Sequence, residues 1–383
     1  MTSLLVILEA TLGGTRRHVV DLLSSLDATA YNITFIYSSD RADKAFSTAL
    51  KKLYDRGIRL QDVRMDRKID LISDIRALIK IIALIREIRP TIIHVHGAKA
   101  GALGRVAAVL CGINEIVYTP HGGAFHKFAS LGGKLYLGVE RFLYLLCDTR
   151  YIGVSRHSCK QIIDSLGLPP SKVCLIYNGI DPPSSSPNTM AEVINIADKK
   201  LFNILYPAMF LEAKGHVPFI EKIYQSKTKI DPRIRIILAG DGHLRRKIED
   251  TIRVCGLESQ IIMLGFIDNM GPLYEKCHMV VLPSKDEAFG YVVLEAMYYG
   301  KLIVASKVGG IREIIRHEEN GLFLDVDGPG DLAVTLNSYA NNSELLNVIA
   351  ENGKIFVRKY FSLAKMVENT FRLYAASESQ CIY

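Results

Sequence analysis

Two glutamates lie eight residues apart where the chain changes from a strand-like to a helix-like pattern. The apolar run Met279–Leu282 predicts a buried parallel strand, a Pro-Ser pair ends it, and helical periodicity begins again at Tyr291. We therefore expect Glu287 in a turn and Glu295 in the following helix, at the edge where open α/β sheets bind ligands. A carboxylate in that turn can contact a sugar, and one on the helix can accept hydrogen bonds from paired hydroxyls such as those of a ribose.

Two further side chains with useful chemistry follow predicted strands. His121 lies after the strand 116–119, in the tight turn T-P-H-G-G, where an imidazole can hydrogen-bond a sugar hydroxyl or a phosphate. Lys214 lies after the strand 204–206, in E-A-K-G-H, where an ammonium can stabilise a phosphate leaving group. A merely packed histidine and a solvated lysine are the alternatives.

Two histidines and a glycine pair give weaker signals. His94 and His96 alternate along a predicted strand and so point to one face, a spacing that formally permits a metal ion. No third ligand of the right kind is near them in the sequence, so we expect structural or acceptor-lining histidines and no metal. Gly13 and Gly14 precede a predicted helix and could let the backbone approach a phosphate, although L-G-G-T-R-R-H is not a dinucleotide fingerprint and a structural turn is the alternative.

The length of 383 residues exceeds what one ordinary core supports, so we expect two domains of about 180 residues each. Strand and helix patterns alternate along the chain, which is typical of a parallel sheet built from βαβ units. The Pro- and Ser-rich run 182–188 interrupts the alternation. The prediction is an α/β fold with two doubly wound Rossmann-like domains, 1–182 and 183–360, facing one another across a cleft, and a C-terminal segment 361–383 whose helix returns to the first domain.

The sequence predicts a cytoplasmic protein. No stretch approaches the roughly 20 uninterrupted apolar residues of a membrane span, and the first ten residues resemble a strand more than a signal peptide. Seven scattered cysteines without a C-x-x-C motif fit reduced thiols and argue against a disulfide framework and a zinc site.

Positive charge is concentrated in the N-terminal half. Residues 1–190 contain 24 Lys plus Arg and 16 Asp plus Glu, a balance of 24 − 16 = +8, whereas the whole chain carries +7. Such a half suggests an anionic partner, either a membrane surface or a phosphorylated acceptor. Nucleic acid is the least expected partner because no basic run with interleaved aromatics occurs, and ordinary solvated helix faces remain the alternative.

One segment of this half could lie in a membrane interface. Apolar residues follow helical spacing between Lys134 and Cys147, beside Arg141, and the basic, aromatic run F-H-K-F occupies residues 125–128. The alternative is a helix packed on its own sheet.

The residues around the two glutamates carry a family resemblance. The stretch reads E-A-F-G-Y-V-V-L-E-A-M, followed by G-K-L-I-V-A-S-K-V-G-G-I-R-E-I-I and N-G-L-F. It resembles the signature of the retaining glycosyltransferases of the GT-B fold commonly numbered family 4, in which seven residues separate two glutamates. Weaker similarity covers nearly the whole chain, including G-G-T-R-R-H, T-P-H-G-G and E-A-K-G-H.

The resemblance implies transfer of a sugar from a nucleotide-diphosphate donor to an acceptor hydroxyl, without a metal cofactor. It implies that Glu295 holds the ribose and Lys214 the diphosphate. Three sets of residues follow from it: catalytic His121, Glu287 and Lys214; donor-binding Gly14, Lys214, Glu287, Phe289, Gly290, Glu295, Gly309 and Gly310; and acceptor-binding Arg16, His96 and His121. The family often has an arginine where this chain has Met209; either another cation, such as Arg16 or Arg17, replaces it or activity is weak.

We thus expect a retaining hexosyltransferase of bacterial cell-surface polysaccharide or glycolipid assembly, peripheral on the inner face of the cytoplasmic membrane, with a saccharide or lipid-linked saccharide acceptor. A glycosidase is disfavoured because its two carboxylates must flank one bond. A metal is not implied because the only D-x-D, residues 325–327, comes too late in the chain and beside a loop. The alternatives are a nucleotide-sugar 2-epimerase and a non-catalytic nucleotide-sugar-binding subunit.

Overall fold

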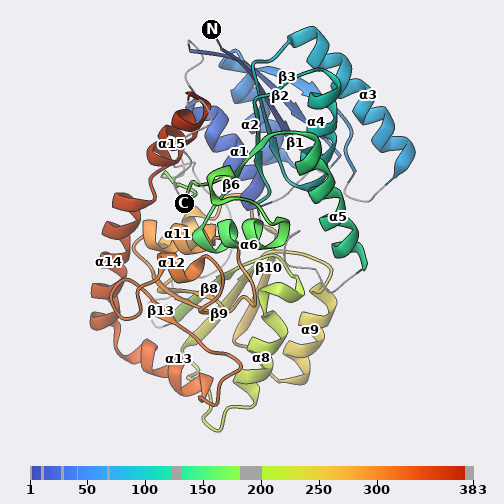
Figure 1. Ribbon diagram of the computed structural model, residues 1–383. Helices are drawn as coiled ribbons and strands as arrows, with labels where there is room; N and C mark the ends of the chain where they lie inside the picture. The colour runs from blue at the N-terminus through green and yellow to red at the C-terminus, as the bar shows by residue number, and fades with distance from the viewer. Residues whose placement is uncertain are drawn as a thin grey trace. The chain divides into compact units, whose positions relative to one another are not determined.

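The computed structural model describes residues 2–9, 13–26, 30–40, 42–66, 70–121, 131–181 and 201–375. The chain forms two compact units, Met1–Gly179 with Leu363–Tyr383, and Ile180–Ser362. Each unit contains one parallel sheet with helices around it (Figure 1). Among the described residues, no helix is both long and apolar enough to cross a membrane.

The sheet of the first unit has the strand order β3-β2-β1-β4-β5-β6-β7, so the chain reverses its direction of winding between β1 and β4. All its strand pairs are parallel, and the register places Leu8 beside His96 and His96 beside Thr119. The carboxyl ends of β1, β4 and β5 therefore lie at one edge. The strands are β1 (Thr2–Leu8), β2 (Tyr31–Tyr37), β3 (Arg59–Asp62), β4 (Ile92–His96), β5 (Ile116–Thr119), β6 (Thr149–Gly153) and β7 (Val173–Leu175).

Helices cover both faces of this sheet because successive strand residues point to opposite sides. Leu5 and Ile7 belong to the core beneath α3, α4 and α6, whereas Leu4 and Val6 belong to the core beneath α1, α2 and α15. The helices are α1 (Gly14–Ser25), α2 (Lys44–Asp55), α3 (Leu71–Ile88), α4 (Ala98–Leu110), α5 (Leu131–Leu146), α6 (Arg156–Leu166), the 3-10 turn η1 (Pro170–Lys172) and α15 (Leu363–Ala375).

The second unit repeats this plan, with the strand order β10-β9-β8-β11-β12-β13 and a reversal between β8 and β11. Its strands are β8 (Phe202–Pro207), β9 (Ile234–Ala239), β10 (Ile261–Gly265), β11 (Met279–Leu282), β12 (Leu302–Ala305) and β13 (Leu322–Phe323). Its helices are η2 (Glu212–Lys214), α8 (His216–Tyr224), α9 (Arg245–Val254), α10 (Gly271–Lys276), α11 (Tyr291–Tyr298), α12 (Ile311–Ile314), α13 (Leu332–Asn341) and α14 (Ser343–Tyr360). The predicted fold class, two doubly wound α/β domains, is confirmed.

The last helix belongs to the first unit. The apolar residues Met366, Val367 and Leu373 join the core on the α1 side of its sheet, and Figure 1 shows α15, in red, beside α1. The structure divides the chain after Gly179 and after Ser362, where the sequence analysis placed the divisions after residues 182 and 360. The proposed linker 182–188 lies outside the described residues.

The expectation of reduced cysteines is wrong for one residue that the structure describes. Cys174 is disulfide-bonded, whereas the free cysteines are Cys111, Cys147, Cys159, Cys255 and Cys277.

Candidate functional site

The centre of the site in the second unit is an ion pair. Glu287 lies in the turn between β11 and α11, as predicted, and its Oε1 accepts hydrogen bonds from Lys214 Nζ at 2.5 Å and from Ser284 Oγ at 2.9 Å. Both charged side chains keep some exposure, 23% for Lys214 and 13% for Glu287. A lysine ammonium has three donors, so Lys214 can also donate to an anionic ligand, which would compete with the carboxylate for its positive charge.

The two loops that carry this pair follow β8 and β11, the neighbouring strands where the winding reverses. Such a switch point is the usual ligand-binding position of a doubly wound sheet. Gly215 has φ +77°, and a Cβ atom there would lie 2.2 Å from Pro283 O. Only glycine therefore lets the Lys214 loop approach the loop of Glu287 so closely. Tyr206 Oη donates a hydrogen bond to Lys214 O, and this bond holds the loop that carries Lys214 in place.

The two glycines after β12 hold the Glu287 loop from the other side. Gly309 has φ +46°, and a Cβ atom there would lie 1.9 Å from Glu287 O. The amide of Gly310 donates to the same carbonyl at 3.0 Å. We expected these glycines to permit approach of a nucleotide; in the structure they permit approach of the backbone of Glu287, and a contact with a nucleotide stays a prediction.

Glu295 lies in α11, as predicted, and has a partner that the sequence analysis missed. Tyr274 donates from its Oη to Glu295 Oε2 at 2.5 Å, and its ring stacks on Tyr299 with centroids 5.2 Å apart. No sequence motif marks Tyr274, and its helix α10, with six residues, is too short to show a helical periodicity. Of the predicted sugar contacts, Phe289 is buried against Phe361 and Gly290, at φ +109°, caps α11.

Two stacked aromatic side chains near Lys214 are uncharged. The rings of Tyr206 and His216 stack with centroids 4.2 Å apart. The pKa of His216 is lowered to about 3, mainly because the ring is buried and to a lesser extent because the ammonium of Lys214 is near. The pKa of Tyr206 is raised well above its ordinary value, mainly by burial and to a lesser extent by the carboxylate of Glu287. Both groups are thus neutral at neutral pH, so neither adds a charge beside the Lys214–Glu287 ion pair.

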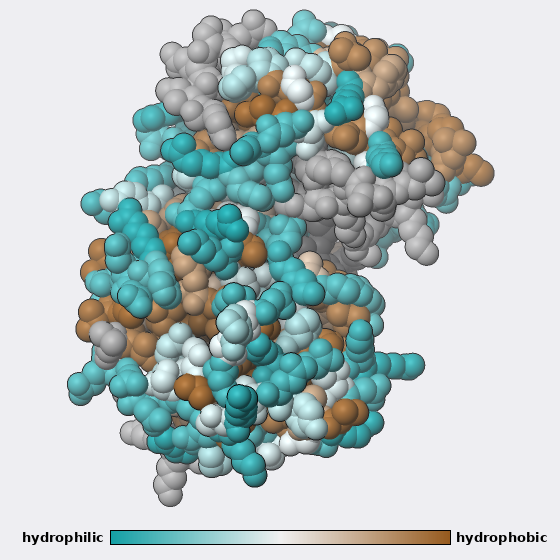
Figure 2. Space-filling view, turned by 60° about the horizontal axis from the view of Figure 1, so that its bottom comes forward, coloured by the Kyte–Doolittle hydropathy of each residue, from teal (hydrophilic) through white to brown (hydrophobic). Residues whose placement is uncertain are grey.

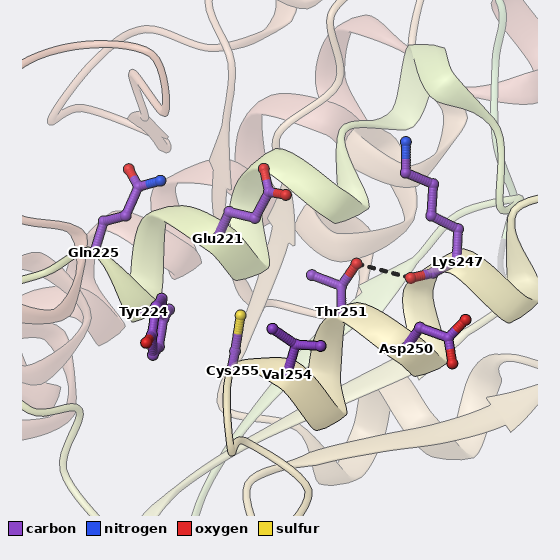
Figure 3. Close-up of a pocket in the computed structure, with 8 residues that line it drawn as sticks. All are labelled: Glu221, Tyr224, Gln225, Lys247, Asp250, Thr251, Val254 and Cys255. Carbon is purple, nitrogen blue, oxygen red and sulfur yellow. Dashed lines mark hydrogen bonds between the residues drawn. The ribbon is translucent and has the colours of Figure 1, made fainter.

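Among the hollows lined by described residues of the second unit, one adjoins the ion pair and another lies apart from it. A groove of about 570 Å³ runs past Gly215, Ser284 and Lys307 to the D-V-D segment 325–327. The other, of about 530 Å³, lies between α8 and α9 on the surface (Figure 3) and contains none of the predicted site residues. Its lining residues are Glu221, Tyr224, Gln225, Lys247, Asp250, Thr251, Val254 and Cys255.

The first unit gathers histidines at the edge where β1, β4 and β5 end. His96 Nδ1 and His121 Nε2 lie 3.0 Å apart, and one ring nitrogen each of His18, His96 and His121 lies within 4.8 Å of the others. The pair of His94 and His96, whose spacing formally permits a metal ion, is not the group that forms here: His18 and His121 lie beside His96, and His94 is not in this group. His18 was missed although it follows β1, whose end adjoins that of β4; the strand order would have revealed it.

Hydrogen bonds fix the rings around this cluster. His18 Nδ1 donates to Asn178 Oδ1 at 2.9 Å. His94 uses both nitrogens, on Tyr374 Oη at 2.6 Å and on Thr119 Oγ1 at 2.8 Å. Burial lowers the pKa of His18 to about 4 and holds the pKa values of the other three histidines well below the ordinary range, with neighbouring imidazoles adding to the effect. The cluster is therefore uncharged at neutral pH.

The remaining predicted residues of the first unit lie near α1. Gly13 has φ +79° and precedes Gly14, the first residue of the helix. Arg16 pairs with Asp43 at 2.8 Å and Arg17 with Asp21 at 3.3 Å, so each contacts a carboxylate of its own unit. The glycines after His121 and the run 125–128 lie outside the described residues.

Helix α5 both packs on its sheet and keeps an apolar face. Its Glu140 is fully buried and accepts a hydrogen bond from Arg105 at 2.7 Å. The opposite stripe is exposed, to 60% at Phe142 and 81% at Leu145, with Leu135, Val139 and Leu146 beside them. Apolar residues gather on the side of the first unit where α3 and α5 lie (Figure 2). Packing on its own sheet and contact with a membrane interface, the two interpretations of this helix, are therefore compatible.

Comparison with known proteins identifies the class. The family model Glyco_transf_4, Glycosyltransferase Family 4, matches residues 12–183, and Glycos_transf_1, Glycosyl transferases group 1, matches residues 189–356. An uncharacterized glycosyltransferase of Methanocaldococcus jannaschii is 30% identical over 288 residues, 74% of each chain. The chain belongs to the glycosyltransferases, and its two-domain fold is of the GT-B class.

Particular relatives share most of its length. The Escherichia coli UDP-Gal:alpha-D-GlcNAc-diphosphoundecaprenol alpha-1,3-galactosyltransferase is 25% identical over 316 residues, 80% of this chain and 81% of the relative. The Anabaena protein HepE, solved with UDP and glucose, superposes with a TM-score of 0.82 at 21% identity, covering 98% of this chain and all of that one. WaaG, a glycosyltransferase involved in lipopolysaccharide biosynthesis, has a TM-score of 0.74 at 15% identity, covering 97% of this chain and all of WaaG.

Proposed function

We propose that this protein is a retaining hexosyltransferase that moves a sugar from a nucleotide-diphosphate sugar to an acceptor hydroxyl. The observation that carries the proposal is the ion pair between Lys214 and Glu287, placed at the switch point of the second sheet. An ammonium at this place stabilises the diphosphate as negative charge develops on it. No metal ion is needed for that task, because Lys214 supplies the positive charge.

Donor binding exchanges partners within this pair. The diphosphate oxygens take hydrogen bonds from Lys214, and the carboxylate of Glu287 then accepts from a hydroxyl of the transferred sugar, together with the amides of Phe289 and Gly290. Glu295 accepts from the ribose hydroxyls while Tyr274 holds its other side. A UDP-sugar is the first donor to test, because HepE was solved with UDP-glucose and the Escherichia coli relative uses UDP-galactose.

The first unit holds the acceptor in this proposal. The neutral imidazole of His121 hydrogen-bonds a hydroxyl at the reacting centre, and His96 and Arg16 line the acceptor side. A neutral imidazole suits this role because it can donate from one nitrogen and accept at the other. Gly14 lies at the start of α1, where backbone amides favour a phosphate.

The acceptor is a saccharide, most simply one linked to a lipid at the cytoplasmic face of a membrane. The apolar stripe of α5 and the basic balance of residues 1–190 support peripheral docking on an anionic surface. The Escherichia coli relative acts on a diphosphoundecaprenol-linked sugar, and a Staphylococcus aureus relative is a capsular polysaccharide biosynthesis glycosyltransferase. The product would thus enter a bacterial cell-surface polysaccharide or glycolipid.

A donor panel tests the activity. The purified protein is screened by thermal shift with nucleoside diphosphates and their sugars, since a specific ligand stabilises the fold by mass action, and the best donor is then incubated with lipid-linked saccharides. Transfer to an acceptor supports the proposal. Release of a free 2-epimer of the sugar nucleotide would support an epimerase. Binding without turnover would support a non-catalytic subunit, an alternative that we consider because Met209 stands where the family often has an arginine.

A further inference from the structure

The three-histidine cluster of the first unit can do more than line an acceptor site. Its side chains come from α1, from the last residue of β4 and from the turn after β5, and one nitrogen of each lies within 4.8 Å of the others. We propose that His18, His96 and His121 form a binding site for a transition-metal ion such as Zn²⁺, and that the bound ion inhibits transfer by withdrawing His121 from the acceptor. The inhibition rests on the proposed function, but the binding does not.

The spacing of the nitrogens is close to that of a three-histidine zinc site. Zinc binds histidine nitrogens at about 2.0–2.1 Å in tetrahedral geometry, so two ligand atoms lie about 3.3 Å apart. His96 Nδ1 and His121 Nε2 are separated by 3.0 Å, which is near this spacing. One ring nitrogen of His18 lies within 4.8 Å of both, so a change in its side-chain torsion angles brings it to the ion. The fourth position stays open for water or an anion.

The three imidazoles are in the protonation state that a metal requires. Histidine binds metal ions as the neutral ring, so a protonated cluster would have to lose protons first. Burial lowers the pKa of His18 to about 4 and keeps the pKa values of His96 and His121 well below their ordinary range. Lone pairs are therefore present at neutral pH without any proton release from an imidazolium.

The hydrogen bonds around the rings also suit a metal site. Because His18 Nδ1 donates to the amide oxygen of Asn178 at 2.9 Å, the lone pair of the neutral ring is on Nε2. A bond from the second nitrogen to an oxygen acceptor is the usual outer-shell arrangement of a metal-bound histidine. His96 Nε2 is buried and has no hydrogen-bond partner among the described residues, so no second bond prevents this ring from changing its tautomer.

His94 is not a ligand of this site, although it is the neighbour of His96. Both of its nitrogens already bond, to Tyr374 and Thr119. Its ring lies against His96 with centroids 3.9 Å apart. It therefore supports the orientation of His96, and three of the four histidines remain as ligands.

The direct test is metal titration of the intact, chelator-treated protein. Zn²⁺ is added in competition with a chromophoric chelator at pH 7.5, and we expect one ion per chain with micromolar or tighter affinity. Co²⁺ in the same site should give the intense visible absorption of four-coordinate cobalt. The variants His18→Ala and Asn178→Ala should each weaken binding about tenfold or more, the second through the outer shell. His243→Ala, which removes an exposed histidine of the second unit, should leave the affinity unchanged.

The binding experiments test the metal site without requiring enzyme activity. No stoichiometric ion, or an ion whose affinity is the same in the folded His18→Ala variant and the wild type, would overturn the site. His18→Gln, of similar size and unable to bind zinc well, serves if the alanine variant does not fold. With an active enzyme, Zn²⁺ should inhibit the wild type and spare His18→Ala at the same concentration. Stoichiometric zinc that leaves transfer unaffected would overturn the inhibition and the role of His121, while the metal site would stand.

Discussion

Lys214 Nζ and Glu287 Oε1 lie 2.5 Å apart, so the cation and the anion of the site in the second unit neutralise one another. A phosphate-bearing ligand has to compete with the carboxylate for the ammonium. Under the proposed function, this relationship gives donor binding an exchange step: the diphosphate would take the cation, and the carboxylate would become available to a sugar hydroxyl. Both side chains are partly exposed, so a ligand can reach them without unfolding the loop.

Removal of either charge should therefore affect the donor in different ways. Lys214→Ala should weaken binding of the nucleoside diphosphate by about 1.5 to 3 kcal/mol, the contribution of a hydrogen bond to a charged group, or roughly 10- to 150-fold. Glu287→Gln should bind the diphosphate at least as tightly as the wild type, since competition is relieved, but lose turnover. Calorimetric titration with the free diphosphate measures both. Lys354→Ala is the control, because this lysine also pairs with a carboxylate, that of Glu351, but lies in α14. Equal affinities of Lys214→Ala and the wild type would refute the assignment.

Glu295 and Tyr274 should act on the donor together. Glu295→Ala should weaken binding of the nucleoside diphosphate by about 1.5 to 3 kcal/mol, because a charged acceptor is lost. Tyr274→Phe should weaken this binding by only about 0.5 to 1.5 kcal/mol. If the tyrosine acts by holding the carboxylate, the double variant should be no weaker than Glu295→Ala. Strictly additive losses in the same titration would show that Tyr274 acts independently.

Gly309 should tolerate no side chain. A Cβ atom would meet Glu287 O at 1.9 Å, and φ is +46°, so Gly309→Ala must displace the turn that carries the carboxylate. We expect a loss of about 1 to 3 kcal/mol in the free energy of unfolding, measured by denaturant titration, with a larger loss of turnover. Gly330→Ala is the control, because nothing lies within 4 Å of its Cβ position; similar unfolding curves for the two variants would contradict the packing argument.

The buried histidines make stability depend on pH. Burial lowers the pKa of His18 from 6.5, the ordinary value of an exposed histidine, to about 4 in the folded protein. Between these values the unfolded chain therefore binds more protons than the folded one. Stability contributed by this group is complete above pH 6.5 and is lost as the pH falls toward 4, by up to about 3 kcal/mol. His18→Gln should flatten the pH dependence of the unfolding free energy in this window. His317→Gln, at an exposed site, should not, and equal slopes in wild type and His18→Gln would contradict the burial effect.

The exposed stripe of α5 should dock on membranes. Sedimentation with vesicles containing anionic lipid should recover the wild type at low salt and less of it at raised salt, because Debye screening weakens the electrostatic part. Leu145→Glu should reduce recovery at both salt concentrations, and Lys134→Glu mainly at low salt. Val254→Glu is the control on an exposed residue of the second unit. Absence of the wild type from the pellet at low salt would leave a soluble acceptor as the better hypothesis.

The alternation of strands and helices was sufficient to predict the fold, because buried parallel strands such as Met279–Leu282 are continuous apolar runs. The positions of Glu287 and Glu295 followed from the same pattern. The sequence could not show that Glu287 is paired with Lys214, 73 residues away, because that contact depends on strand order. Tyr274 and His18 were missed for the same reason, and the periodicity of α5 could not tell which part of an apolar surface its own sheet buries.

The measurement that tests the central claim most directly is the anomeric configuration of the first-formed product. Proton NMR should follow wild-type reactions with a UDP-α-hexose and a lipid-linked saccharide, with Lys214→Ala and Glu287→Gln in parallel. We predict an α-linked product from the outset, and a large loss of rate in both variants. A β-linked product, or unchanged rates in both variants, would contradict a retaining transferase centred on this ion pair.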